Sequence, residues 1–253
     1  MYRQVTLQVA GWISAVGDVG HFMADAARSL RDVKVWPSLT AEQMMLVGVN
    51  SVPIALFIAA FTGVVLSMQA SYTLTGAVPL YFVGTAVGKS LLLELGPVLT
   101  GLVLAGRVGA NIAAELGTMR VTEQVDALET LAYDPHSYLV VPRVLAASMM
   151  FPVIVAMASA LGIITGWLTA VNLLDLSSFE FFKGIKMFYN FKDVWYGLVK
   201  SISFGFFIAL IGCMQGLSVH GGAEGVGRAT TQAVVQSAAM ILVLDAAWAV
   251  AVL

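Results

Sequence analysis

The stretch MMLVGVNSVPIALFIAAFTGVVLSM, from Met44 to Met68, carries no charged side chain and is long enough to decide the fold class. A helix needs roughly 20 predominantly apolar residues to cross the hydrocarbon core of a bilayer, because each residue advances it by about 1.5 Å. Four further segments meet this requirement, over approximately residues 80–105, 144–174, 194–217 and 233–253. The sequence therefore predicts an all-α integral membrane protein with about five transmembrane helices.

The composition leads to the same class. Hydrophobic residues make up 59% of the chain and charged residues 11%, whereas soluble domains are usually about 25% charged. The net charge is −2 and the basic residues are dispersed, so the basic surface that binding to phosphate backbones requires is missing. We predict a membrane protein with no nucleic-acid partner.

Residues 1–35 show a different pattern, in which apolar residues recur at helical spacing and polar residues fall on the other side. The apolar set is Val5, Val9, Trp12, Val16, Val19, Met23 and Leu30. This pattern predicts an N-terminal amphipathic helix lying in the membrane interface. A cleaved signal peptide is less favoured, because Gln8 and Ser14 interrupt its apolar region.

The distribution of Lys and Arg favours one orientation of the chain in the membrane. With a cytoplasmic N-terminus, that side holds Arg3, Arg28, Arg31, Lys34, Arg107, Arg120, Arg143 and Arg228, against Lys89, Lys183, Lys186, Lys192 and Lys200 on or toward the other. The C-terminus then lies outside the cell, and residues 115–142 form a cytoplasmic loop.

The chain shows no pattern typical of a catalytic or metal site. The segment VGTAVGKS, Val83 to Ser90, nearly matches a phosphate-binding loop, but Val83 replaces its first glycine and an apolar helical run surrounds it. The three histidines are scattered. We therefore expect no catalytic residue, metal or cofactor on this chain, and any ATP hydrolysis must belong to another chain.

Charged residues within spans are costly and are candidates for function. We expect Lys89, Arg107 and Lys200 to reach water near helix ends. Glu94 and Asp245 have shorter side chains, so we expect Glu94 to face a polar cavity or pair with a cation, and Asp245 to hold helices together. If the two carboxyl groups titrate, the chain is instead an ion- or proton-coupled secondary transporter.

The sequence pattern over residues 115–142 predicts a short helix that docks onto a partner protein. Thr122 is placed to cap a short helix beginning at Glu123, with Val125, Leu128 and Leu131 along one apolar edge. A solvated loop without a partner is the alternative. The candidate coupling residues are Glu115, Arg120, Glu123, Asp126, Leu128 and Glu129.

Glycines recur four residues apart at three places, which allows helix backbones to approach closely. The pairs are Gly84 with Gly88, Gly162 with Gly166, and Gly212 with Gly216. Each pair serves packing within the chain or between two copies, and packing within the chain is favoured for any single pair.

The run LELGPVLTGLVLAGRVGANIAAELGTMRVTEQVDAL, Leu93 to Leu128, resembles the MlaE (YrbE) family of permeases. The later GRATTQAVVQSA, Gly227 to Ala238, is similar to the penultimate loop and last helix of the same family. The resemblance implies that residues 1–253 form a single ABC permease domain, which works as a homodimer in the bacterial inner membrane.

The resemblance also implies the partners and the cargo. These are a cytoplasmic ATPase dimer, a STAS-domain subunit in some systems, a periplasmic hexamer of mammalian-cell-entry (MCE) domain proteins, and phospholipid moving between the inner and outer membranes. The family's coupling helix falls on Val121 to Leu131. Its lipid cavity, at the dimer interface, falls on Leu66, Gln69, Tyr72, Leu74, Glu94, Leu95, Val98 and Leu102.

The sequence departs from the family pattern at Leu93, where a basic residue commonly precedes the glutamate. Glu94 therefore lacks an adjacent cation, and Lys89, one helical turn earlier, is the candidate to take its place.

Overall fold

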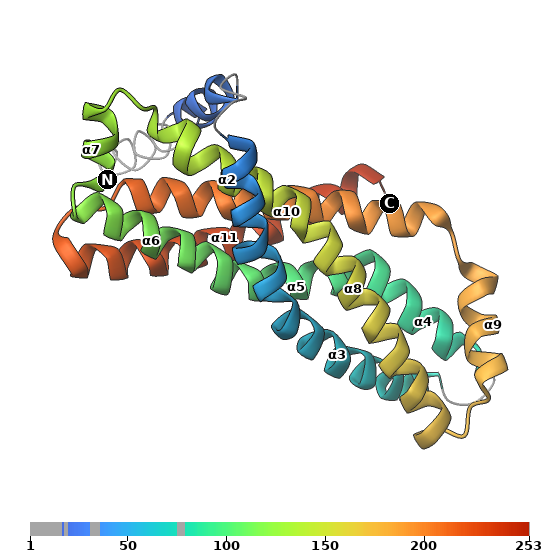
Figure 1. Cartoon of the computed structure of the whole chain (residues 1–253). Helices are drawn as coiled ribbons and strands as arrows, with labels where there is room; N and C mark the ends of the chain where they lie inside the picture. Colours follow the sequence, from blue (N-terminus) through green and yellow to red (C-terminus); the bar gives the residue numbers. More distant parts are fainter. Residues whose placement is uncertain (1–16, 18–19, 31–35, 75–78, 253) are drawn as a thin grey trace, which may run out of the picture.

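The computed structural model describes residues 17, 20–30, 36–74 and 79–252. Within these ranges the chain is helical without β-strands, and five helices are long and apolar enough to cross a membrane (Figure 1). They run over Trp36–Thr73, Phe82–Val121, His136–Leu173, Phe191–Leu217 and Gly222–Val252. The predicted all-α architecture with about five spans is confirmed. Of the N-terminal amphipathic segment, the structure describes a helix at residues 20–29, and most of the rest lies outside the described residues.

The first three spans are divided by short π-helical or 3-10 turns. The first span consists of α2 (Trp36–Gln43), η1 (Met44–Gly48), η2 (Val49–Ser51) and α3 (Val52–Thr73). The second consists of α4 (Phe82–Ser90), η3 (Leu91–Leu95), α5 (Gly96–Leu104), η4 (Ala105–Gly109) and α6 (Ala110–Val121). The third consists of η5 (His136–Val140) and α8 (Val141–Leu173), and the other two spans are α10 (Phe191–Leu217) and α11 (Gly222–Val252). Two short helices, α7 (Gln124–Thr130) and α9 (Ser178–Phe188), lie in the connections.

Two prolines lie where the helices change geometry. Pro53 and Pro97 occupy the first turns of α3 and α5, directly after irregular turns. A proline lacks the N–H that would bond a carbonyl of the preceding turn, and a local change to 3-10 or π-helical geometry accommodates this missing hydrogen bond within a spanning helix. Pro152 instead lies inside α8, which continues as one α-helix from Val141 to Leu173.

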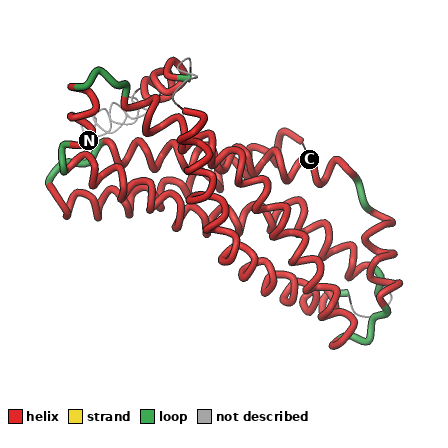
Figure 2. Tube along the Cα trace, in the orientation of Figure 1, coloured by secondary structure: helices red, strands yellow, loops and turns green. Residues whose placement is uncertain are grey.

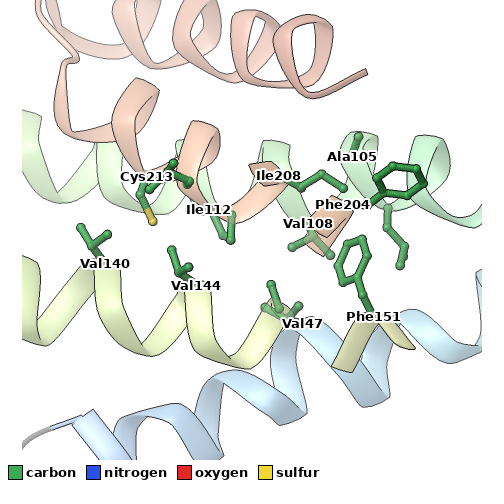
Figure 3. Packing of buried hydrophobic residues seen from close by; sticks show 14 of the residues in the cluster. Val47, Ala105, Val108, Ile112, Val140, Val144, Phe151, Phe204, Ile208 and Cys213 are labelled. Carbon is green, nitrogen blue, oxygen red and sulfur yellow. The ribbon is translucent and has the colours of Figure 1, made fainter. Parts of the chain in front are cut away.

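The buried core joins all five spans. Figure 3 shows Val47 from the first span, Val108 and Ile112 from the second and Phe151 from the third directed toward side chains of α10. Cys213 is a free cysteine buried in this cluster, where it packs among apolar side chains. A second cluster includes Val87, Ala170 and Phe181 and holds α4 against α8 and α9.

The connections define two opposite ends of the molecule (Figures 1 and 2). One end carries α7 and the turn between α10 and α11, where Gly221 and Gly222 adopt positive φ angles of 90° and 70°. The other end carries α4 and α9. The end of α11 lies beside the start of α10, where the Tyr196 and Trp248 rings meet edge to face. The C-terminal end of α11 and helix α7 are therefore on opposite sides.

The glycine pairs bring helices of this chain into backbone contact. A Cβ atom on Gly63 would lie 2.0 Å from the Gly162 carbonyl oxygen, and one on Gly84 would lie 2.1 Å from that of Phe181. Gly212 and Gly216 are also packed closely, though less tightly: a Cβ atom on Gly212 would lie 3.1 Å from the Gly109 carbonyl oxygen, and one on Gly216 would lie 2.7 Å from Leu116 Cβ. The three predicted pairs therefore all take part in packing within the chain.

We predict that Gly63→Ala destabilises the fold by about 3 kcal/mol, because the new methyl group meets backbone atoms that cannot move aside. Gly227→Ala on α11, where a Cβ atom meets nothing within 4 Å, is the matched control and should leave stability unchanged or slightly higher. SDS titration of the purified protein in mixed micelles measures both. Equal stability of the two variants would contradict this account of the α3–α8 contact.

Candidate functional site

An apolar hollow lies between the first and second spans. It has a volume of about 400 Å³, within the range of small-molecule sites. Its walls are Phe57, Ile58, Phe61, Thr62, Val65, Leu66, Gln69, Leu95 and Leu99. Only Thr62 and Gln69 bring polar side chains to it, so it suits a hydrocarbon chain better than a polar solute.

Three of the residues implied by the family resemblance line this hollow: Leu66, Gln69 and Leu95. The other five lie elsewhere. Val98 and Leu102 pack against the main core, Leu74 packs against the second cluster, Tyr72 is 84% exposed, and Glu94 forms an ion pair.

The resemblance did not indicate Phe57, Phe61 or Val65, which line the same hollow. Their spacing of four residues places them on one face of α3. This periodicity is visible in the sequence, but within a uniformly apolar span it does not distinguish the face that lines a hollow from the face that meets lipid.

A buried charged cluster joins the second, fourth and fifth spans. Lys200 on α10 is fully buried, and its Nζ donates to Glu94 Oε2 at 2.6 Å. The same ammonium group forms an ion pair with Asp245 on α11 and lies 5.1 Å from the centre of the Tyr196 ring. The prediction that Lys200 reaches water was wrong. An unpaired ammonium in this position would be very costly, and the two carboxylates supply the opposite charge.

The ion pairs of this cluster show which of the roles expected for Glu94, Asp245 and Lys89 are correct. Glu94 pairs with a cation, as one of its two readings predicted, and Asp245 links helices as expected. Lys89 does not replace the missing neighbour of Glu94, because its Nζ lies 3.6 Å from Asp193 instead. The sequence did contain a signal, since the predicted spans offered only Glu94 and Asp245 as carboxylate partners for a buried lysine.

We predict that Lys200→Met destabilises the protein by about 3 kcal/mol or more, because it leaves two carboxylates facing each other without a cation. Adding Glu94→Gln and Asp245→Asn to this variant removes the uncompensated charge and should restore much of the loss. SDS-induced unfolding in mixed micelles measures the stability of the wild type, the Lys200→Met variant and the triple variant. No recovery in the triple variant would contradict a mainly electrostatic role for the cluster.

Helix α7 presents an acidic surface next to the second span. Glu123, Asp126 and Glu129 are exposed, Val125 is buried, Leu128 is partly buried and Leu131 is 68% exposed. Arg120 at the end of α6 pairs with Asp126 at 2.5 Å. Glu115 lies further from α7 and accepts a 2.7 Å hydrogen bond from the buried Arg143, which joins α6 to α8.

The expected cap of this helix was wrong. α7 begins at Gln124, and Glu123 precedes it with a left-handed φ of 60° and no side-chain cap. The Thr122 hydroxyl instead donates to the Thr118 carbonyl at 2.8 Å. Thr122 follows the last turn of α6, where its hydroxyl reaches the carbonyl four residues earlier, so the local bond within α6 wins over capping of α7.

The helix at residues 20–29 is tied to the loop that follows α7. The Ser29 hydroxyl donates to Asp134 Oδ2 at 2.5 Å, and the rings of Phe22 and His136 lie 5.2 Å apart. Ser137 and the His136 backbone N–H also donate to Asp134. Partial burial raises the pKa of Asp134, but the hydrogen bonds outweigh it and hold this pKa below its ordinary value.

The lowered pKa of Asp134 predicts a pH dependence. A carboxyl group whose pKa is depressed on folding stabilises the fold above its unfolded pKa of about 3.9, and this contribution is lost as the pH falls through the lower, folded pKa. The melting temperature of the wild type should exceed that of Asp134→Asn above about pH 4, and the two should converge below it. Thermal unfolding in detergent between pH 3 and 7 tests this, and a constant difference would contradict it.

Comparison with known proteins supplies the class of the chain. Residues 40–251 match the family model described as Permease MlaE. A probable ABC transporter permease protein of Rickettsia prowazekii is 42% identical over 90% of this chain and 88% of its own length. Probable ABC transporter permease proteins of Synechocystis and Porphyra purpurea are also similar. The first is 44% identical over 81% of this chain and 78% of its own length, and the second is 34% identical over 88% of this chain and 85% of its own length.

Proposed function

Since this chain belongs to the MlaE permease family of ABC transporters, we propose that it is the membrane-spanning subunit of an ATP-driven phospholipid transporter. The observation that carries the proposal is the apolar hollow between α3 and the η3–α5 part of the second span. A hydrocarbon-lined hollow of about 400 Å³ holds an acyl chain and gives a polar solute almost no hydrogen-bond partner.

The hollow is open on one side, where Phe57, Phe61 and Val65 are 64%, 58% and 59% exposed. A second copy of the chain packed against this face would close the hollow into a larger cavity. We therefore propose a homodimer with the lipid between the two copies, consistent with the family resemblance read from the sequence.

Helix α7 is the proposed contact with a separate ATPase dimer. Its exposed carboxylates and partly exposed apolar edge suit a basic groove on a partner protein. A movement of α7 reaches the second span through Arg120 and Asp126, and reaches the third span through the contacts of Asp134. ATP is the cofactor of the partner and not of this chain.

The proposed location is the bacterial inner membrane, with the N-terminus cytoplasmic and the C-terminus periplasmic. This orientation puts α7 in the compartment that contains ATP, and it puts α4 and α9 on the side of a periplasmic MCE-domain hexamer. A STAS-domain subunit on the cytoplasmic side completes the proposed complex, which moves phospholipid between inner and outer membranes.

The alternative, a secondary transporter driven by ions or protons through Glu94 and Asp245, is not favoured. Members of this family are ABC permeases, which take their energy from an ATPase, and both carboxylates already share the buried ammonium of Lys200.

We predict that Glu123→Lys combined with Glu129→Lys reduces recovery of the ATPase with the purified chain at least tenfold, equivalent to about 1.4 kcal/mol of binding free energy. Both carboxylates are exposed, and the Arg120–Asp126 pair is left intact. ATP-dependent transfer of labelled phospholipid between vesicles should fall in parallel.

The control is Glu42→Lys, an exposed carboxylate on α2 outside the docking surface, which should behave as wild type. Full transport by the double variant, or transport by the chain alone under a proton gradient, would contradict the proposal.

A further inference from the structure

A second, polar hollow lies between the same two spans as the apolar one. It has a volume of about 230 Å³. Its lining residues are Gln43, Leu46, Val47, Asn50, Ser51, Arg107, Val108, Asn111 and Ile112. One guanidinium group, three side-chain amides and a hydroxyl therefore surround a small space with partly apolar walls.

Arg107 is a spanning-helix cation without a carboxylate partner. Lys89, Arg143 and Lys200 pair with Asp193, Glu115 and the Glu94–Asp245 pair. In the part of the chain that the structure describes, no carboxylate lies within ion-pairing distance of Arg107, whose Nη1 donates to the Asn50 carbonyl oxygen. A guanidinium group has five N–H donors, so one backbone carbonyl satisfies little of it. A cation placed this way in a membrane protein calls for an anion.

The spacing of the two hollows matches the size of a lipid. Leu99 and Leu95 line the apolar hollow and lie 8 and 12 residues before Arg107 on the same span, which corresponds to about 12 and about 18 Å at 1.5 Å per residue. One leaflet contributes about 15 Å to a hydrocarbon core of about 30 Å. An acyl chain that begins beside Arg107 therefore reaches the apolar hollow.

We propose that the polar hollow binds the phosphate of a phospholipid, with Arg107 as its cationic ligand and the amides of Asn50 and Asn111 as further donors. Guanidinium groups bind phosphate oxygens through two parallel hydrogen bonds, which is the geometry this unpaired side chain offers. The lipid head lies toward the α7 end of the protein and its acyl chain lies in the apolar hollow. The inference rests on the proposed function, because it locates the head group of the proposed cargo.

The test is photocrosslinking of the full chain, with its partners, in membranes of cells grown on ³²P-phosphate. A benzophenone amino acid replaces Leu46 in the polar hollow, Phe61 in the apolar hollow, or Ile164, a 47% exposed residue of α8 outside both hollows. Benzophenone captures C–H bonds, so it labels a phospholipid and not inorganic phosphate. We expect more ³²P-lipid at Leu46 and Phe61 than at Ile164, which reports the surrounding bilayer.

Arg107→Gln should reduce labelling at Leu46 at least fivefold, because the head group is no longer held there. Acyl chains still enter the apolar hollow by contact with its own walls, so labelling at Phe61 should stay within twofold of wild type, which also shows that the variant folds. Asn111→Leu, which leaves the contact of Arg107 with Asn50 in place, should reduce labelling at Leu46 in the same direction. The charge control is Arg228→Gln, an exposed arginine on α11 paired with Glu224, and it should change neither position.

Three outcomes would overturn the proposal. First, labelling at Leu46 that is no stronger than labelling at Ile164 and is unchanged by Arg107→Gln shows that only bilayer lipid contacts Leu46. Strong labelling at Phe61 in the same experiment would still support the proposed function. Second, a crosslink from Leu46 to a second copy of the chain assigns the polar hollow to a protein contact. Third, if labelling at both Leu46 and Phe61 is no stronger than at Ile164, the proposal of a phospholipid cargo is contradicted as well.

Discussion

The burial of Lys200 is the constraint on which the arrangement of the spans depends. Its ammonium group contacts Glu94 on the second span and Asp245 on the fifth, so one side chain of α10 fixes the relative positions of three helices. Inside a membrane the hydrophobic effect gives helices little reason to associate, because lipid tails are as apolar as leucine. The ion pairs therefore fix how these three helices are oriented relative to one another, which apolar contacts alone do not.

Close backbone packing fixes the relative positions of the first and third spans. Gly63 and Gly162 let α3 lie directly against α8, while the first and second spans leave two hollows between them. The interface between the first and third spans is therefore tightly packed, whereas the interface between the first and second spans contains two hollows. The proposed path of the lipid follows the interface between the first and second spans. Helix α7 lies at one end of this path, together with the loop after it that contacts residues 20–29.

The five spans could be predicted from the sequence, because the thickness of a bilayer fixes how long an apolar run must be. The position of α7 followed from its acidic residues and from the family resemblance. The fate of Lys200 did not follow, because a lysine six residues inside a predicted span can either reach water or meet carboxylates from distant segments. Thr122 failed as a cap because a local hydrogen bond within α6 competed for its hydroxyl. The hollow walls contributed by Phe57 and Phe61 depend on which face of α3 meets the second span, and a uniformly apolar helix does not encode this in its composition.

The central claim is that this permease holds phospholipid between its first two spans and works with a separate ATPase. The most direct measurement is native mass spectrometry of the chain extracted from its own membrane in a mild detergent, with identification of every bound protein and lipid. The account predicts a complex that contains two copies of the chain, an ATPase and retained phospholipid. Recovery of a single chain without ATPase or lipid, active in transport after reconstitution alone, would contradict it.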